Sequence, residues 1–329
     1  MEPSKHPAIF IIVLIALGIG IGVTISWLLF RPNAIDTGHT LRLTDPNYPL
    51  IKPLLACNID STTPTKTLDP LQSSLQDAVD RATAAGDITR AGIYIRKLSD
   101  GTWTAVHGDD EYSPASLMKI VTLFVYLHDA DNDPSVLDRV LVVDPTINTG
   151  TQNIIPTSTA IPGKRYTVNE LLRYMIVNSD NVATLTLVHN TQNDELNTLL
   201  NDLEIPGYLD EENFTISPRH YSRFLRILYN STLLSEKSSE FALELLAASD
   251  YRDALVQGIA PQETTAHKFG ERGITNADGS KSYQLHDCGI VYALEPYMLC
   301  IMTEGNDLPT LANTIASFTT IVDTFINTY

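Results

Sequence analysis

The pattern of apolar and polar residues divides the chain into an uncharged N-terminal run, a polar stretch and a long mixed remainder. The run from Pro7 to Phe30 contains 24 residues and no charged side chain. A helix rises 1.5 Å per residue, so a helix of this length spans the hydrocarbon core of a bilayer. The run therefore predicts a transmembrane anchor at 7–30 behind a cytoplasmic tail at 1–6. A cleaved signal peptide is the alternative, but its apolar region is usually shorter, and no small-x-small cleavage site follows Trp27.

Residues 31–68 are rich in Thr, Pro and Asp and predict a linker. Its apolar segment, 48–57, is expected to pack on the domain that follows. Cys57 stands in "LLAC", which is similar to a lipidation box but lies more than 20 residues beyond the apolar run, so we expect it to be unmodified. Basic residues flank the apolar run on both sides, so the positive-inside rule does not orient it.

The remaining residues, 69–329, carry helix and strand periodicities in a definite order. A helical pattern that ends at Gly86 is followed by two strand patterns joined by the turn "SDG". Four helical patterns come next, and then three strand patterns and a closing helix at 308–329. This order predicts an α+β fold in which an antiparallel five-stranded sheet is flanked by helices and carries an inserted all-helical lobe.

Charge and composition remove several function classes. The chain has 39 acidic and 22 basic residues, for a formal charge of −17, and no cluster of Lys or Arg. We therefore do not expect the protein to bind nucleic acid, because such binding needs a basic surface. The histidines and cysteines show no zinc-ligand or HExxH spacing, so we expect neither a metal nor another cofactor.

Two of the three cysteines fall in neighbouring strand patterns. Cys288 and Cys300 stand on either side of the turn "LEP", nearly equally far from it, so they face each other if these strands form a hairpin. They are then either a disulfide or two buried thiols that pack as small apolar residues.

The stretch "SPASLMK" at 113–119 offers a nucleophile and a base. Positions three apart share a helix face, so Ser116 and Lys119 can lie together. A buried lysine loses its proton more easily, and the neutral amine can then take the proton of an attacking hydroxyl. The alternative is an ordinary helix start, with Ser113 as N-cap, Pro114 in the first turn and Lys119 in solvent.

Two further motifs follow along the chain. Ser179, Asp180 and Asn181 form "SDN" after an apolar helical pattern, and Lys268 and Gly270 stand in "HKFG" on a predicted strand. Taken singly, the first reads as a helix cap in a polar turn. Glu271 and Arg272, which come next on the strand, are expected to form surface pairs.

The order S-x-x-K, S-D-N, K-x-G resembles the signature of class A β-lactamases and penicillin-binding proteins. The resemblance covers about residues 69–329 and includes the helices around "SDN". It implies an acyl-enzyme mechanism with Ser116 as nucleophile and Lys119 as general base. It also implies that Ser179 relays a proton to the leaving nitrogen, and that Asp180 only fixes the turn.

The resemblance assigns substrate contacts as well. Asn181 holds the amide of the substrate and orients Lys119, and Lys268 attracts the carboxylate of the substrate. Gly270 lets the substrate lie along the strand. The backbone N–H groups of Ser116 and Glu271 form the oxyanion hole.

The sequence departs from this signature at two places. Phe269 stands where the family usually has Thr or Ser, so it lacks the hydroxyl that helps to bind the substrate's carboxylate. The loop that carries a water-activating Glu in class A β-lactamases is shortened to "YLDEENFT". Asp210, Glu211 or Glu212 could replace that base, but a solvated acidic turn is the preferred interpretation.

Slow hydrolysis of the acyl-enzyme is typical of penicillin-binding proteins. We therefore expect a D,D-peptidase or transpeptidase acting on the D-Ala-D-Ala ends of peptidoglycan stem peptides and acylated by β-lactams. A true β-lactamase is the first alternative, and a weakly catalytic sensor of wall fragments or β-lactams is the second. The peptidase and the β-lactamase both require the domain to face the cell wall, so we expect a single-pass protein of the cell membrane with its N-terminus inside and its domain outside the cytoplasm.

Overall fold

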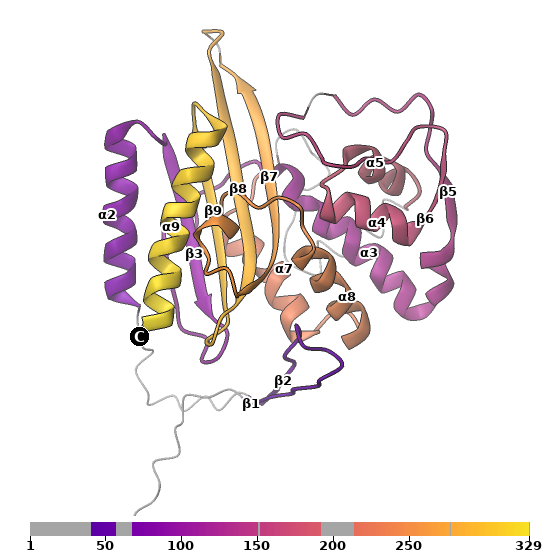
Figure 1. Ribbon diagram of the computed structural model, residues 1–329, viewed down its shortest axis with the longest axis horizontal. Coiled ribbons are helices and arrows are strands. Elements are labelled where there is room, and N and C mark those ends of the chain that lie inside the picture. Colours follow the sequence, from indigo (N-terminus) through magenta and orange to yellow (C-terminus); the bar gives the residue numbers. More distant parts are fainter. Residues whose placement is uncertain (1–40, 57–67, 151, 192–213, 277, 329) are drawn as a thin grey trace, which may run out of the picture. The chain divides into compact units, whose positions relative to one another are not determined.

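The computed structural model describes residues 41–56, 68–150, 152–191, 214–276 and 278–328. A five-stranded antiparallel sheet with the strand order β4-β3-β9-β8-β7 lies at its centre (Figure 1). This confirms the expected sheet, including its antiparallel pairing. The strands are β3 (Arg90–Lys97), β4 (Trp103–Val106), β7 (Thr264–Thr275), β8 (Lys281–Tyr292) and β9 (Tyr297–Gly305).

The central strand β9 shows how both faces of the sheet are buried. Met298, Cys300 and Met302 point into one apolar core, while Leu299 and Ile301 between them point into the other. This is the period of two that a strand imposes on its side chains. A strand that is covered on both faces reads as the continuous apolar run seen in the sequence.

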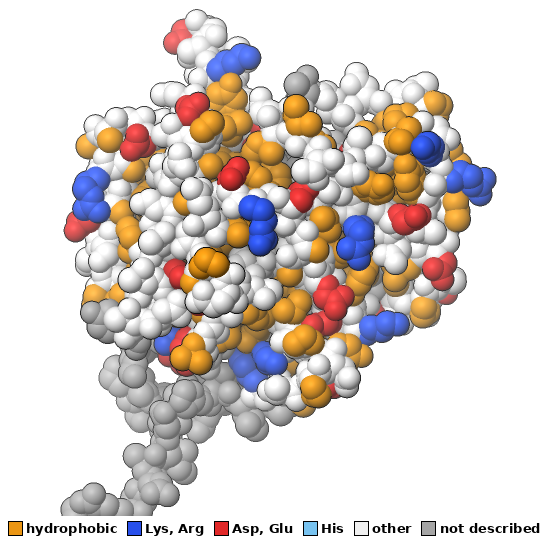
Figure 2. All heavy atoms as spheres, in the orientation of Figure 1, with side chains coloured by type: hydrophobic (Ala, Val, Ile, Leu, Met, Phe, Trp, Pro, Cys, Tyr) orange, Lys and Arg blue, Asp and Glu red, His pale blue; other side chains and the backbone are white. Residues whose placement is uncertain are grey.

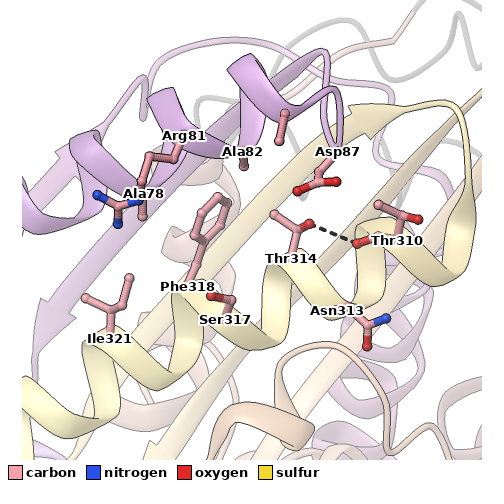
Figure 3. A pocket seen from close by; sticks show the side chains of 11 residues that line it. Ala78, Arg81, Ala82, Asp87, Thr310, Asn313, Thr314, Ser317, Phe318 and Ile321 are labelled. Carbon is pink, nitrogen blue, oxygen red and sulfur yellow. Dashed lines mark hydrogen bonds between the residues drawn. The ribbon is translucent and has the colours of Figure 1, made fainter.

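Two helices cover one face of the sheet. They are α2 (Asp69–Ala85) and α9 (Leu308–Thr328), and both contribute apolar side chains to the same core. Gly86 ends α2 in a left-handed conformation, with φ 80°, as the sequence predicted. A hollow between the two helices is lined by Ala78, Ala82 and Phe318 among others (Figure 3), and none of the motif residues reaches it.

The helical lobe is inserted between β4 and β7, as expected, and its core is continuous with the other face of the sheet. Thr167 and Glu170 form a capping box at the start of α4. The lobe also contains a short hairpin, β5 (Val140–Val142) and β6 (Arg165–Thr167), which the sequence did not predict. The helices are α3 (Lys119–Asn132), α4 (Val168–Val177), α5 (Asn181–His189), α7 (Pro218–Asn230) and α8 (Glu236–Ala247).

Part of the expected linker, 31–68, is attached to the domain. Residues 41–56 include β1 (Leu41–Arg42) and β2 (Leu54–Ala56), which pair with each other. Ile51 is only 2% exposed and lies in the core of the lobe. The carboxylate of Glu240 on α8 accepts hydrogen bonds from the backbone N–H groups of Leu50 and Ile51 at 2.9–3.0 Å. The apolar segment of the linker therefore packs on the domain, as expected.

The predicted anchor, 7–30, and the tail before it lie outside the described residues, as does Cys57. Within the ranges that the structure describes, no helix is both long enough and apolar enough to cross a membrane. The anchor therefore stays a prediction from the sequence.

Candidate active site

Ser116 lies in a single turn of 3-10 helix, η1 (Ala115–Met118), that leads directly into α3. Ala115 just before it has φ 49°, in the left-handed region that side chains disfavour. Backbone held in this region is often found at active sites. Ser116 is partly exposed while Leu117 and Met118 behind it are buried, so part of this residue faces solvent.

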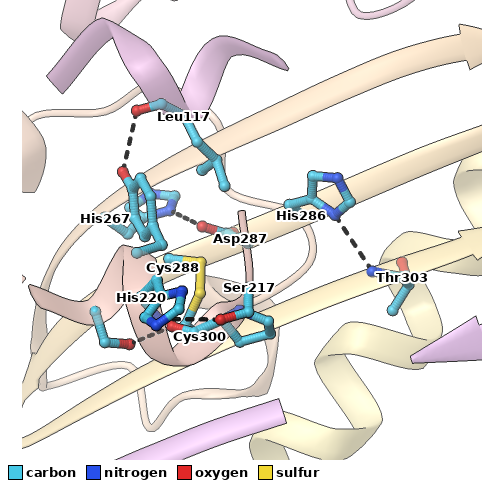
Figure 4. The surroundings of a disulfide bond; sticks show 12 residues. Leu117, Ser217, His220, His267, His286, Asp287, Cys288, Cys300 and Thr303 are labelled. Carbon is cyan, nitrogen blue, oxygen red and sulfur yellow. Dashed lines mark hydrogen bonds and ion pairs between the residues drawn. A yellow bond between two sulfur atoms is a disulfide. The ribbon is translucent and has the colours of Figure 1, made fainter. Parts of the chain in front are cut away.

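Ser113 is held by strands β7 and β8 and does not cap the helix. Its hydroxyl accepts a hydrogen bond from Arg272 at 2.7 Å, and its N–H donates to Gln284 at 3.2 Å. Its carbonyl accepts from Nε2 of His286 at 3.0 Å. Burial lowers the pKa of His286 to about 4, so the ring is neutral at pH 7 and its Nδ1 accepts from the N–H of Thr303 (Figure 4). These contacts fix the chain just before the nucleophile.

The "SDN" motif forms the turn between α4 and α5. Asp180 is the N-cap of α5 and accepts from the backbone N–H groups of Val182 and Ala183 at 3.0 and 3.1 Å, which is the structural role expected for it. Ser179 has φ 55°, so this turn is also strained. Asn181 begins α5. The turn therefore presents the side chains of Ser179 and Asn181 toward α3.

The three motifs meet at Ser179. Lys119 Nζ donates to the carbonyl of Ser179 at 2.6 Å, to its Oγ at 3.2 Å and to Oδ1 of Asn181 at 2.8 Å. Lys268 Nζ donates to the same Oγ at 2.8 Å and to the carbonyl of Phe269 at 2.8 Å. The hydroxyl of Ser179 thus accepts from both lysines, and its own proton remains available for donation.

Ser116 is close to Lys119 in sequence, but the two side chains are not hydrogen-bonded to each other. In the part of the chain that the structure describes, Lys119 Nζ bonds to Ser179 and Asn181, with no hydrogen bond to Ser116 Oγ. Ser116 lies in the 3-10 turn and Lys119 starts the α-helix. Side chains three apart also share a face in a 3-10 turn, so the expected pairing of these two residues stays a prediction.

Both lysines are buried, and burial is the main cause that lowers their pKa values. The pKa of Lys119 falls to about 7, although the charges of Asp180 and Glu271 oppose the shift. The pKa of Lys268 lies well below its ordinary value, because burial is reinforced by the positive charge of Lys119. Neutral Lys119 at neutral pH is able to accept a proton. A carboxylate brought next to Lys268 would raise the pKa of Lys268 again and stabilise its charged form.

Gly270 is required by the contact between β7 and η1. A Cβ atom at this position would lie 2.6 Å from the carbonyl oxygen of Pro114 and 3.0 Å from the N atom of Leu117. The strand thus approaches the backbone on either side of the nucleophile. This is a structural reason for glycine in addition to the expected access of substrate to the strand, which no contact here tests.

Among the described residues, Glu271 and Arg272 make polar contacts other than the surface charge pairs that the sequence suggested. Arg272 donates to Ser113. The Glu271 carboxylate accepts from the N–H and the side-chain amide of Asn153, at 2.8 and 2.6 Å. Asn153 was not predicted from the sequence, because it lies in the connection between β5 and β6 and belongs to none of the motifs.

Phe269 is a core residue in this strand. Its ring is 4% exposed and stacks on Tyr251 with the ring centroids 4.0 Å apart. It lies on the side of the sheet that carries α2 and α9. The residue therefore supplies its backbone carbonyl to Lys268 and supplies no hydroxyl to the site. The candidate bases Asp210, Glu211 and Glu212 lie outside the described residues.

Cys288 and Cys300 form a disulfide bond, which decides between the two alternatives that the sequence left open (Figure 4). They are directly opposite each other in the register of β8 and β9. Both side chains are buried on the face of the sheet next to the lobe. The bond links β8 and β9, and β8 is the neighbour of β7, which carries Lys268.

Comparison with known proteins identifies the family and the fold of the chain. The family model described as "Beta-lactamase enzyme family" matches residues 70–326. No curated protein matches the chain. The solved structure of PBP-A is similar, with 24% identity over 81% of this chain and 99% of that one, and a TM-score of 0.66.

Two other solved structures have the same fold. One is a mutant of PBP-A described as an acyl-enzyme complex with penicillin G, with 22% identity over 81% of this chain and 100% of that one, and a TM-score of 0.67. The other is a class A β-lactamase representative from Bacteroides cellulosilyticus, with 17% identity over 79% of this chain and 99% of that one, and a TM-score of 0.65. The family model matches well over half of the residues of this chain, so the chain belongs to the β-lactamase enzyme family and is a serine hydrolase.

Proposed function

We propose that the protein is a membrane-anchored D,D-peptidase or transpeptidase that acts on D-Ala-D-Ala stem peptides and is acylated by β-lactams. The observation that carries the proposal is the pair of buried lysines that share Ser179, together with a partly exposed Ser116 three residues before Lys119. This arrangement supports the roles of Lys119 as a base of lowered pKa, Ser179 as a proton relay, Lys268 as the contact for a carboxylate and Ser116 as the nucleophile.

The residues divide the reaction into an attack and a bond cleavage, linked by three proton transfers. Ser116 Oγ attacks the carbonyl carbon while Lys119 takes the hydroxyl proton. The N–H groups of Ser116 and Glu271 stabilise the negative oxygen of the tetrahedral intermediate. The C–N bond then breaks, and Ser179 passes its proton to the leaving nitrogen and regains one from Lys119. The product is an ester on Ser116. A peptide substrate releases D-Ala, whereas an opened β-lactam ring stays attached within the ester.

Substrate contacts follow the same geometry. Lys268 attracts the carboxylate of the substrate, Asn181 holds its amide, and the free edge of β7 offers backbone groups to the peptide. On the face in Figure 2, Lys and Arg side chains lie singly among acidic and apolar ones. The absence of a continuous basic area on that face favours a peptide substrate over a nucleic acid.

Location outside the cytoplasm is supported by two features. The run 7–30 is long enough to span a bilayer, and the Cys288–Cys300 disulfide is typical of an oxidising compartment. A domain held there by the linker would face the cell wall, where the stem peptides lie.

The fate of the ester separates the proposal from its alternatives. Class A β-lactamases share the fold, so hydrolysis of β-lactams is the second candidate, and trapping without turnover, as in a sensor, is the third. In the proposed enzyme a β-lactam leaves a long-lived ester on Ser116, whereas D-Ala-D-Ala peptides are turned over.

The test is intact mass spectrometry of the full chain in detergent, mixed with penicillin G and sampled over time. The full chain is needed because residues 41–56 pack on the domain. We expect a stable adduct of one penicillin in the wild type and in Ser73→Ala, an exposed-serine control, and none in Ser116→Ala. Release of D-Ala from a D-Ala-D-Ala peptide completes the proposal. Rapid loss of penicillin with a transient adduct would instead establish a β-lactamase, and an adduct without D-Ala release or transfer would establish a sensor.

A further inference from the structure

Residues 152–160 cross the site as a strap, a name used here for this part of the connection between β5 and β6. Gln152 donates from its side-chain amide to the carbonyl of Ser179 at 3.3 Å. The next residue, Asn153, bonds to Glu271 on β7. Two consecutive residues therefore contact the two elements, the "SDN" turn and β7, between which the substrate has to lie.

The Glu271 carboxylate is the anchor of the strap on the strand side. One oxygen accepts from the N–H of Asn153 at 2.8 Å and from that of Ile154 at 3.3 Å, and the other accepts from the side-chain amide of Asn153 at 2.6 Å. Hydrogen bonds to an ionised acceptor are stronger than neutral ones. Ile154 also packs against the core on the α2–α9 side of the sheet, so the strap reaches over the edge of β7.

The other end of the strap is fastened to the lobe. Thr159 Oγ1 and the N–H of Ala160 donate to the Asp180 carboxylate at 2.7 and 2.8 Å. Thr157 donates to Asp250, which also accepts from Asn178 at 2.9 Å. Asp180 is 1% exposed, whereas Glu271 is partly exposed and its partner Asn153 is exposed. The strap is therefore held at the lobe by a buried acceptor and at β7 by one that water can reach.

The polar groups around Ser179, whose carbonyl Gln152 contacts, are almost inaccessible. Lys268 is 0% exposed, Ser179 is 2% exposed and Lys119 is 5% exposed. Ser116, at the end of the site formed by η1, is partly exposed. A substrate that reaches Ser116 must therefore fit beneath the strap or displace it.

We infer that the contact between Asn153 and Glu271 is a latch that limits the size of the acyl group the enzyme accepts. The inference rests on the proposed function, in which the carboxylate end of the substrate lies at Lys268 and the attacked carbonyl at the N–H of Glu271. The rest of the acyl group then continues along β7 toward Gly273. Asn153 stands there, because a Cβ on Gly273 would lie 3.4 Å from its side-chain nitrogen. Compact acyl groups end before the latch, and long ones require it to open.

The latch is exposed and is made of a few hydrogen bonds, so it opens and closes and does not seal the site. A substrate that needs the open state binds in proportion to the fraction of molecules that are open. Its acylation rate is reduced by that fraction, whereas the rate with a compact substrate is not. The latch therefore acts on the ratio of the two rates.

The first test compares two penicillins in the full chain, one with an acetyl side chain and one with a bulky fluorescent dye on the acyl nitrogen. We expect Asn153→Ala to raise the acylation rate constant with the dye-penicillin about tenfold, and that with the acetyl compound less than about twofold. Asn132→Ala is the matched control, because its side chain bonds only within α3, to the carbonyl of His128. Adducts on Ser116 with an unchanged rate ratio would overturn the latch alone. If neither probe forms an adduct, the proposed function is overturned, and the selection of acyl groups is overturned with it.

The second test needs no substrate. Hydrogen exchange of the Asn153 and Ile154 amides should be protected in the wild type and in Asn132→Ala, and should become faster in Glu271→Ala. Two results would show that the carboxylate does not hold the strap. One is exchange of these amides at the unprotected rate in the wild type, and the other is the same exchange rate in Glu271→Ala as in the wild type.

Discussion

Burial turns Lys119 from an ordinary cation into a group that exchanges its proton near neutral pH. Its ammonium has acceptors at Ser179 and Asn181, so the charged form keeps its hydrogen bonds. Desolvation nevertheless outweighs these contacts and the nearby carboxylates, and the pKa falls to about 7. A base with its pKa close to the working pH is the most effective one.

This pKa predicts the pH dependence of acylation. The reactive form of Lys119 is the neutral amine, which is scarce below the pKa and dominant above it. The rate constant for acylation of Ser116 by penicillin G should therefore rise with pH and level off above about pH 7 to 8. It is measured by stopped-flow or timed mass spectrometry from acidic to alkaline buffer.

Lys119→Arg is the control for this profile. A guanidinium keeps the positive charge but does not lose its proton in a protein, so the variant should be acylated slower by orders of magnitude at every pH. A wild-type rate that is constant across the range, or an active Lys119→Arg enzyme, would contradict the assignment of Lys119 as base.

At the residue scale, the sequence predicts the motif residues and misses their surroundings. Ser116, Lys119, Ser179 and Lys268 are recognisable because their spacing is a signature with a chemical reason. The partnership of Asn153 with Glu271 joins positions 118 residues apart, and neither residue type is unusual in a loop or a strand. Such a contact depends on the path of the connection between β5 and β6, which follows no periodic pattern.

At the scale of elements, the site depends on the contact of an edge strand with a short helical turn. β7 passes so close to η1 that only a glycine fits at position 270. The same strand carries Lys268 two residues earlier, and its neighbour β8 carries Gln284 and His286, which hold Ser113. The close contact at Gly270 and the hydrogen bonds of Gln284 and His286 thereby fix the position of the nucleophile relative to the strand.

Gly270→Ala tests this contact. The new methyl group would meet backbone atoms of Pro114 and Leu117, which cannot rotate away as a side chain does. We expect a loss of about 1–3 kcal/mol in the free energy of unfolding, typical of overpacking, and slower acylation by penicillin G. Both are measured on the same preparation, by denaturant unfolding and by adduct formation.

Gly273→Ala in the same strand serves as the comparison. Its Cβ would approach Asn153 no closer than 3.4 Å, which is an ordinary contact. Its stability should stay within about 0.5 kcal/mol of wild type. Equal losses in the two variants would mean that the strand tolerates no alanine at all, and that η1 is not the cause.

The apolar periodicity of the sequence predicts the long elements and misses the short ones. The long patterns predicted α2, α9 and the three strands β7, β8 and β9, because each has many apolar positions at one period. The hairpin of β5 and β6 has three residues in each strand, too few to show a period. The 3-10 turn at Ser116 is invisible for the same reason, since its residues continue the apolar pattern of α3.

At the scale of the whole molecule, one sheet separates two apolar cores and the disulfide joins its two most buried strands. Cys288 and Cys300 both point toward the lobe, so the bond stiffens the face on which the active site is assembled. The sequence placed these cysteines opposite each other but did not distinguish a disulfide from two thiols, because the pairing fits both equally well.

The disulfide connects the structure to the compartment in which the protein works, and this leads to a last prediction. Protein purified from the membrane fraction and unfolded without reductant should react with a thiol reagent at Cys57 alone, and at all three cysteines after reduction. Cys288→Ala combined with Cys300→Ala should lower the free energy of unfolding by about 2–4 kcal/mol, because the bond closes a loop of 12 residues in the unfolded chain. Cys57→Ala, outside the disulfide, should leave it unchanged. Three reactive thiols without reduction would show that the domain matures in a reducing compartment, which would contradict both the bond and a location facing the cell wall.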